Sequence, residues 1–234
     1  MAELLRILST LAVQGAMPAL ACCYERLAGA RLAVEFAPTN GLMAKIDAGE
    51  RADVAILTRE GADQLAARGV LRPDSVVDVV RSYVGIAVRA GARKPDIGSS
   101  EALKTVLLSA KSIAYSRIGA SGILFARLIE QLGIAEEVNA KATIIPSGFT
   151  AELVARGEAE LAVQQVSELM VVPGVDIVGP LPAPLQSPAM FSAGVFADCA
   201  EPDGAERFLQ FLTSDAAAPM LQAAGLEPLL TPRQ

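Results

Sequence analysis

The sequence contains no histidine and no tryptophan, and only three of its 234 residues are cysteine. Without histidine, the commonest general base and the commonest zinc ligand are missing, which excludes serine–histidine hydrolysis and typical zinc catalysis. Cys22 and Cys23 are adjacent in a helical pattern and Cys199 is far away, a spacing that predicts reduced, buried thiols and suits no metal. We therefore expect neither a metal nor a cofactor.

Positive charge is also scarce, because 20 Lys and Arg oppose 26 Asp and Glu, for a formal net charge of −6. This acidity, without a basic cluster, argues against nucleic acid as a partner. No apolar run reaches membrane-spanning length without a charge or a proline, so we expect no membrane segment. The start lacks a basic region, and Arg6 interrupts its apolar stretch. The sequence as it stands predicts a cytoplasmic protein, or a periplasmic one whose export signal has been removed.

Short apolar strands alternate with helices along the first third of the chain. Residues 4–8, 32–36 and 52–57 are typical of buried strands, and residues 17–28 and 59–68 have helical patterns. Strands that are apolar throughout are typical of parallel sheets covered on both faces. The alternation therefore predicts an α/β fold with mainly parallel sheets.

The pattern changes within residues 76–88, where two strand-like runs follow each other without a helix, as expected of a chain crossing between lobes. Residues 192–196 are typical of a strand that returns to the first lobe. We therefore expect two α/β lobes joined by two crossover segments that form a hinge. Residues 1–80 with 190–234 are expected to form lobe 1, which is discontinuous, and residues 81–189 to form lobe 2.

Two serines precede helical patterns in the second half of the chain. Ser147 is expected to cap a helix that runs through Arg156, and Ser214 one that runs from Asp215 to Ala224.

Ser116–Gly122 is the most informative segment, a small-residue loop between a buried strand and a helical pattern. Glycine lets a ligand approach the backbone closely, and a helix N-terminus offers free N–H groups and the positive end of its dipole. Arg117 adds a planar cation suited to a carboxylate or an oxyanion. The loop predicts a small-anion site, although a strand-to-helix turn also uses glycine for its shape alone.

Ligands of open α/β sheets bind beyond the carboxyl ends of the strands. Four such ends carry polar side chains here, and we expect them to donate hydrogen bonds to a small anionic ligand while the arginine pairs with its charge. The expected ligand-binding residues are Ser9, Thr10, Thr39, Asn40, Ser116, Arg117, Ser121, Gly122, Gln164 and Gln165.

Three segments carry a resemblance to a known family. Residues 36–54 combine a polar turn, an apolar helix and Gly-Glu-Arg-Ala-Asp-Val, residues 157–168 contain Gly-Glu-Ala-Glu-Leu-Ala-Val-Gln-Gln, and residues 208–226 form a closing helix pair. In this order they resemble the type II periplasmic solute-binding proteins, most closely the molybdate-binding branch, which includes aconitate isomerase-like proteins. The resemblance covers nearly the whole chain. It implies a two-lobed type II periplasmic-binding-protein fold with a ligand cleft between the lobes and, for an exported form, an ABC permease as partner.

Departures from the molybdate pattern bear on the ligand. The pattern has a serine where this chain has Thr39-Asn40, a tyrosine at the position of Gln165, and generally no arginine like Arg117. Amides and a guanidinium form forked hydrogen bonds that suit planar carboxylates. We therefore expect an organic di- or tricarboxylate, where the family default would be a molybdate-like oxyanion.

Three functions remain open. The first is a solute-binding protein without chemistry. The second is an isomerase that moves a proton across the allylic system of an unsaturated tricarboxylate, with Arg117 and Arg81 as anchors. Its base would be Glu168, Tyr83 or a carboxylate of the substrate, although Ser167 and Glu168 are also candidates for a helix cap. The third is a ligand-responsive regulatory domain, which would need a partner chain.

Overall fold

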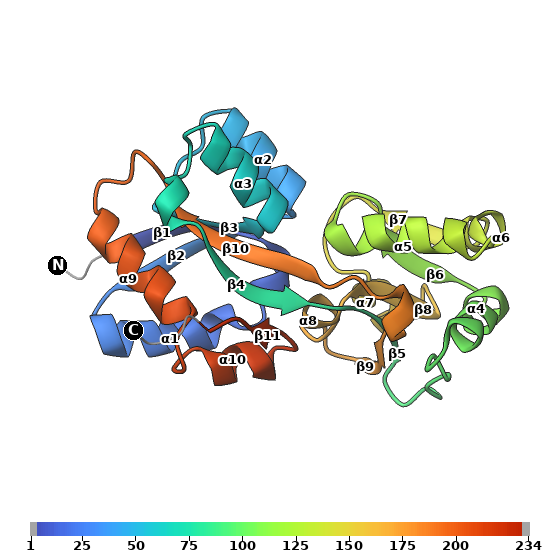
Figure 1. The fold of residues 1–234 in the computed structure, drawn as a ribbon. Helices are drawn as coiled ribbons and strands as arrows, with labels where there is room; N and C mark the ends of the chain where they lie inside the picture. The colour runs from blue at the N-terminus through green and yellow to red at the C-terminus, as the bar shows by residue number, and fades with distance from the viewer. Residues whose placement is uncertain (1–3, 231–234) are drawn as a thin grey trace. The chain divides into compact units, whose positions relative to one another are not determined.

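The structure is a computed structural model, and it describes residues 4–230. The chain forms two compact units (Figure 1). The first unit runs to Arg81 and resumes at Met190, and the second comprises Ser82–Ala189. Each unit contains one sheet with helices packed on it, and each is described by itself.

The first unit contains a six-stranded sheet in the order β11-β4-β10-β3-β1-β2. The strands are β1 (Leu4–Ser9), β2 (Arg31–Phe36), β3 (Val54–Thr58), β4 (Val77–Ser82), β10 (Ala189–Val195) and β11 (Glu227–Pro228). The helices are α1 (Met17–Ala28), α2 (Thr39–Asp47), α3 (Arg59–Ala67), α9 (Pro202–Leu212) and α10 (Ala218–Ala223), with short 3-10 turns η1 (Leu11–Val13) and η2 (Pro73–Ser75). Figure 1 shows α2 and α3 on one side of this sheet and α1 and α10 on the other.

The second unit contains a five-stranded sheet in the order β7-β6-β8-β5-β9. The strands are β5 (Val84–Arg89), β6 (Ile113–Ser116), β7 (Ala142–Ile145), β8 (Leu161–Gln165) and β9 (Val175–Pro180). The helices are α4 (Ser100–Ser109), α5 (Ala120–Gln131), α6 (Ala135–Asn139), α7 (Ala151–Ala155) and α8 (Val166–Leu169), with one 3-10 turn η3 (Ala183–Leu185).

Both sheets are mixed rather than mainly parallel. In the first, β1 pairs in parallel with β2 and β3, whereas β10 runs antiparallel to β3 and β11 antiparallel to β4. In the second, β6 pairs in parallel with β7 and β8, whereas β5 runs antiparallel to β8 and β9. Parallel neighbours need a crossover connection, usually through a helix. The antiparallel strands include β5 and β10, which begin at the two points where the chain passes from one unit to the other.

Side-chain alternation explains how the second sheet is covered on both faces. Ile86 of β5 packs in a core with Phe125 of α5, whereas the next residue, Ala87, packs in a second core with Val154 of α7 and Leu169 of α8. Successive residues of a strand point to opposite faces, so these two cores lie on opposite sides of the sheet. Figure 1 shows α5 and α8 on these two sides.

The two predicted serine caps are wrong. The helix expected after Ser147 begins only at Ala151, with Thr150 at its N-cap. The hydroxyl of Ser214 donates backwards to the carbonyl of Phe211 at 2.7 Å, and α10 begins at Ala218. Serine hydroxyls often bond to nearby backbone groups in this way, which makes them ambiguous signals for a helix start.

The three cysteines are free, as expected, but the prediction that they are buried is wrong. Cys22 is exposed, and Cys23 and Cys199 are half-buried. The buried face of α1 carries Leu20 and Tyr24. Cys22 lies two residues from each of them and therefore faces away from the core.

Candidate functional site

The start of α5 packs directly on the end of β6. A Cβ atom on Gly122 would lie 1.4 Å from the carbonyl oxygen of Ser116, so this approach requires glycine. Gly119, at the N-cap, has extended backbone (φ −92°, ψ 162°), and no side chain of the described residues caps the helix. The first N–H groups of this twelve-residue helix thus lack a capping side chain, the arrangement that binds anions at helix N-termini.

The polar side chains of the loop take different roles. The hydroxyl of Ser116 accepts a hydrogen bond from the backbone N–H of Ile118 at 3.3 Å, which stabilises the turn. Ser121 lies in the first turn of α5 and is buried. The loop therefore brings Ser116, Ser121 and Gly122 together at one end of β6.

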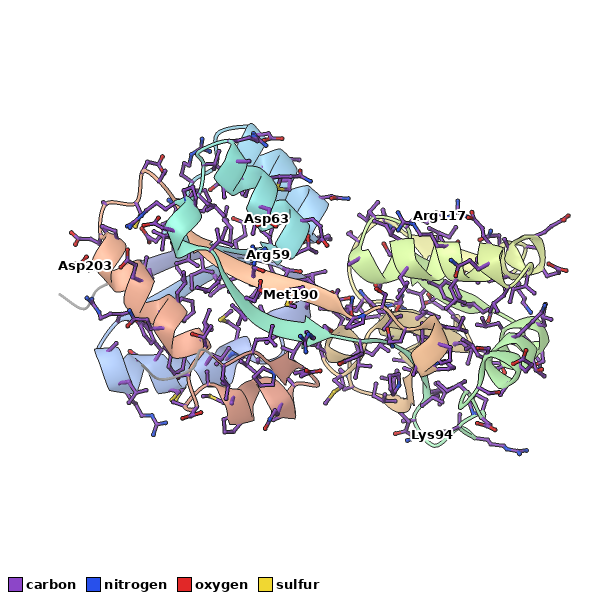
Figure 2. All side chains as sticks on the ribbon, in the orientation of Figure 1. Arg59, Asp63, Lys94, Arg117, Met190 and Asp203 are labelled. Atoms are coloured by element: carbon purple, nitrogen blue, oxygen red, sulfur yellow. The ribbon has the colours of Figure 1, made fainter. Side chains whose placement is uncertain are left out.

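Arg117 is held by two neutral groups. Its Nε donates to the hydroxyl of Tyr115 at 3.1 Å, and its Nη2 donates to Oδ1 of Asn139, in α6, at 3.1 Å. The guanidinium carbon also lies 5.9 Å from the ring centroid of Tyr115. Figure 2 shows Arg117 on the α5 side of the unit. Because these partners carry no charge, the positive charge of Arg117 is not compensated by them, and its role as a ligand contact stays a prediction.

The side-chain amide of Gln164 forms hydrogen bonds within the protein itself. Its Oε1 accepts hydrogen bonds from the backbone N–H and the hydroxyl of Thr150, at 2.8 and 3.0 Å. Its Nε2 donates to the carbonyl of Gly148 at 3.1 Å. These bonds attach the loop before α7 to the end of β8, so Gln164 organises this edge of the sheet.

Gln165, the next residue, is almost completely buried, with 2% of its surface exposed. Neither its amide nitrogen nor its amide oxygen has a hydrogen-bond partner among the described residues. A buried, unsatisfied amide costs about 1–3 kcal/mol, and such groups in native structures call for an explanation. Gln165 therefore has the features of a side chain that completes its hydrogen bonds with a ligand.

Glu168 lies three residues further on, in α8, and is also buried, with 8% of its surface exposed. Burial raises the pKa of its carboxyl group to about 7, and hydrogen bonds from the Gln164 side chain and the Gln165 backbone oppose this shift. The sequence analysis named Glu168 as one candidate base but did not place it among the expected ligand-binding residues, and its burial could not be predicted from the sequence.

The first unit also gathers polar groups at strand ends. Buried Ser9 donates to the carbonyl of Thr10 at 3.2 Å, and the hydroxyl of Thr10 caps η1. The hydroxyl of Thr39 accepts from the backbone N–H of Thr58 at 3.3 Å, which connects the start of α2 to the end of β3. Asn40 follows and is exposed. The structure thus places four predicted residues at this edge and the other six in the second unit.

Arg59 is a strand-end cation that the sequence analysis did not select. It follows β3 and forms ion pairs with Asp63 and Asp78, each at 2.9 Å. Figure 2 shows Arg59 and Asp63 on the same helix. Burial acts to raise the pKa of Asp78, but hydrogen bonds from Ser192 and Arg59 outweigh it and leave that pKa below its usual value. Two carboxylates neutralise Arg59, so it stabilises the first unit and is not available to a ligand.

Within residues 4–230, no group of three or more His, Cys, Asp or Glu side chains is arranged to hold a metal ion. No helix in that range is long and apolar enough to cross a membrane.

The two adjacent glutamines predict opposite effects on stability. Gln165→Leu removes two unsatisfied polar atoms at similar volume and is expected to raise the free energy of unfolding by about 1–2 kcal/mol. Gln164→Leu removes the hydrogen bonds of this side chain to Thr150, Gly148 and Glu168 and is expected to lower the free energy of unfolding by about 1–3 kcal/mol. Urea denaturation of the unliganded proteins measures both. Equal destabilisation by the two substitutions would contradict the assignment of Gln165.

Comparison with known proteins agrees with this architecture. The chain matches the family described as bacterial extracellular solute-binding protein over residues 5–227. It is 36% identical to an aconitate isomerase of Pseudomonas sp., across 96% of this chain and 88% of the relative.

Solved structures with a similar fold include oxyanion-binding proteins. The periplasmic molybdate-binding protein of Azotobacter vinelandii has a TM-score of 0.81 at 20% identity, covering 98% of this chain and 100% of that one. The sulfate-binding protein of Mycobacterium tuberculosis has a TM-score of 0.74 at 16% identity, covering 97% and 87%. These structures confirm the type II periplasmic-binding-protein fold. The chain belongs to the bacterial extracellular solute-binding proteins.

Proposed function

We propose that this protein binds an unsaturated tricarboxylate of the aconitate type and isomerises it. The likeness to the aconitate isomerase of Pseudomonas sp. carries the proposal, because it reaches 36% identity over nearly the whole chain. The molybdate- and sulfate-binding structures share only 20% and 16% identity, which supports a common fold without a common ligand.

The donors in the second unit support a planar carboxylate ligand. The start of α5, which no described side chain caps, offers backbone N–H groups, and Gln165 offers an amide that has no hydrogen-bond partner among residues 4–230. Arg117 is held by neutral acceptors, so its charge can pair with an anion. An amide and a guanidinium match the two oxygens of a carboxylate with forked hydrogen bonds.

Isomerisation of aconitate requires a proton to leave one carbon and reach another. The methylene carbon loses a proton, the double bond shifts by one position, and the former vinyl carbon gains a proton. The enolate-like charge that develops in between needs hydrogen-bond donors near the adjacent carboxylate. The N-terminus of α5 and the Gln165 amide are the donors we assign to this task.

Binding without chemistry is the second candidate function. The fold similarity to the Azotobacter vinelandii molybdate-binding protein, over the full length of that protein, favours it. Such a receptor would select an oxyanion or a carboxylate with neutral donors and, in an exported form, deliver it to an ABC permease. An isomerase needs no such partner.

Two measurements on the same preparation separate these functions. In a thermal-shift series with trans-aconitate, other di- and tricarboxylates, molybdate and sulfate, a ligand of the folded state raises the melting temperature with the logarithm of its concentration. Chromatography of trans-aconitate after incubation detects cis-aconitate. The proposal expects stabilisation by trans-aconitate and formation of the cis isomer. Stabilisation by molybdate alone would establish an oxyanion receptor, and stabilisation by trans-aconitate without turnover a carboxylate receptor.

A further inference from the structure

Glu168 occupies an unusual position for a carboxyl group. It lies in the one-turn helix α8, directly after the carboxyl end of β8, with 8% of its surface exposed. The groups that hydrogen-bond to it, the Gln164 side chain and the Gln165 backbone N–H, are both neutral. A buried carboxyl without a cationic partner is costly and is typical of a functional site.

A helix cap does not account for this arrangement. Glu168 is the third residue of α8 and reaches back to the N–H of Gln165, as the glutamate of a capping box does. The reciprocal bond is absent, because the Gln165 side chain does not cap α8 and has no partner within residues 4–230. A cap also works at the surface, where the carboxylate stays solvated, so it gives no reason to bury both side chains.

Three contacts with residues 82–85 fix the backbone that carries Glu168. The N–H of Val166 donates to the carbonyl of Tyr83 at 2.8 Å, and the hydroxyls of Ser167 and Ser82 lie 3.3 Å apart. A Cβ atom on Gly85 would lie 2.6 Å from Cγ2 of Val166, so β5 and α8 are in tight contact. Catalytic groups need such rigid support to hold a productive geometry.

These observations support a role in the proposed isomerisation, on which the inference rests. We propose that Glu168 is the acid–base group that moves the proton. Its carboxylate takes a proton from the methylene carbon. The electron pair of the broken C–H bond forms the new double bond, and the electrons of the old double bond move onto the carboxylate attached to the vinyl carbon. The protonated carboxyl then returns the proton to the former vinyl carbon. The same carboxyl group removes and returns the proton, so the step conserves all atoms and needs no oxidant or reductant.

Few charged groups lie on the strands that pack against α8. On β5, β8 and β9 the titratable side chains are Arg89 and Asp176. Arg89 pairs with Val175 and therefore lies about 17 Å along the strand from the Val84–Gln165 pair that precedes α8. Asp176 accepts from the backbone N–H of Gly91. Tyr83, just before β5, contacts α8 through its backbone carbonyl.

Three variants of the full chain test the proposal with trans-aconitate. Glu168→Gln keeps the shape and the acceptor for Gln165 but cannot take a proton, so turnover is expected to fall by at least about 100-fold. Trans-aconitate should still raise its melting temperature as in the wild type. Glu168→Asp should recover part of the turnover. Glu130→Gln, an exposed glutamate of α5, is the matched control and should leave turnover unchanged.

The pH profile adds a readout that a purely structural role would not change. Glu168 must be ionised to take the proton, so kcat/KM of the wild type should rise with pH and level off above about 7. Full turnover by Glu168→Gln would overturn the role of Glu168 as the acid–base group, and so would an equal loss of binding and turnover in both Glu168 variants. In either case an active wild type would still uphold the proposed function. A wild type that binds trans-aconitate without turnover would overturn the isomerase function itself.

Discussion

Gly122→Ala is expected to destabilise the protein by about 3–5 kcal/mol, an effect at the upper end for a single substitution. The new methyl group would lie 1.4 Å from the carbonyl oxygen of Ser116, and backbone atoms cannot move aside as a flexible side chain can. The start of α5 must therefore separate from β6, which disturbs the packing of Phe125 and the rest of that core. Urea or thermal denaturation measures the loss.

Gly119→Ala provides the matched control three residues earlier. A Cβ atom at Gly119 has no neighbour within 4 Å, and its extended backbone suits any residue. The substitution is expected to change the free energy of unfolding by less than about 0.5 kcal/mol. If both alanine variants melted like the wild type, α5 would not pack on β6 as described, and the proposed anion site at its N-terminus would lose its basis.

The raised pKa of Glu168 predicts that the folded protein loses stability as pH rises. Its pKa is raised from 4.5 to about 7 in the folded protein, so the folded state holds the proton more tightly than the unfolded chain does. The stabilisation is complete below pH 4.5, where both states are protonated. It is lost as pH rises to about 7, because the unfolded chain ionises freely while the folded protein must ionise a buried group. The total change from this residue is about 3 kcal/mol.

Glu168→Gln isolates this contribution, since glutamine carries no titrating proton. From pH 4.5 to 7 the free energy of unfolding of the variant is expected to rise relative to that of the wild type. Above pH 7 the difference is expected to stay constant. Glu130→Gln should show no such trend. A pH-independent difference for Glu168→Gln would mean that the carboxyl group is solvated in the folded protein, contrary to its burial.

Much of the fold follows from local pattern. The helix at residues 17–28 has the predicted bounds, and the strand at residues 32–36 and the helix at residues 59–68 lie within one residue of theirs, because their apolar spacing and end signals agree. The strand β9 and the helix α6 were not predicted. Residues of β9 are only half-buried, and α6 has five residues, too few for a helical period to show.

The candidate site was less accessible to sequence reasoning. The polar strand ends can be located from the sequence, but the partner of each side chain is set by contacts between distant segments. Gln164 and Gln165 are the same residue type at adjacent positions, yet Gln164 binds Thr150 and Gly148 while Gln165 has no partner among the described residues. Because side chains alternate along β8, the two amides point to opposite faces of the sheet. Which face offers a hydrogen-bond partner depends on the segments that the fold packs there. The burial of Glu168 likewise depends on β5 and β9, which pack against α8.

The most direct test of the proposed isomerisation is proton magnetic resonance of trans-aconitate mixed with the purified protein. We expect the vinyl resonance of cis-aconitate to grow at a rate proportional to protein concentration, and Glu168→Gln to slow this growth strongly while the ligand still binds. An unchanged trans-aconitate spectrum, from a preparation that molybdate stabilises against heat, would contradict it.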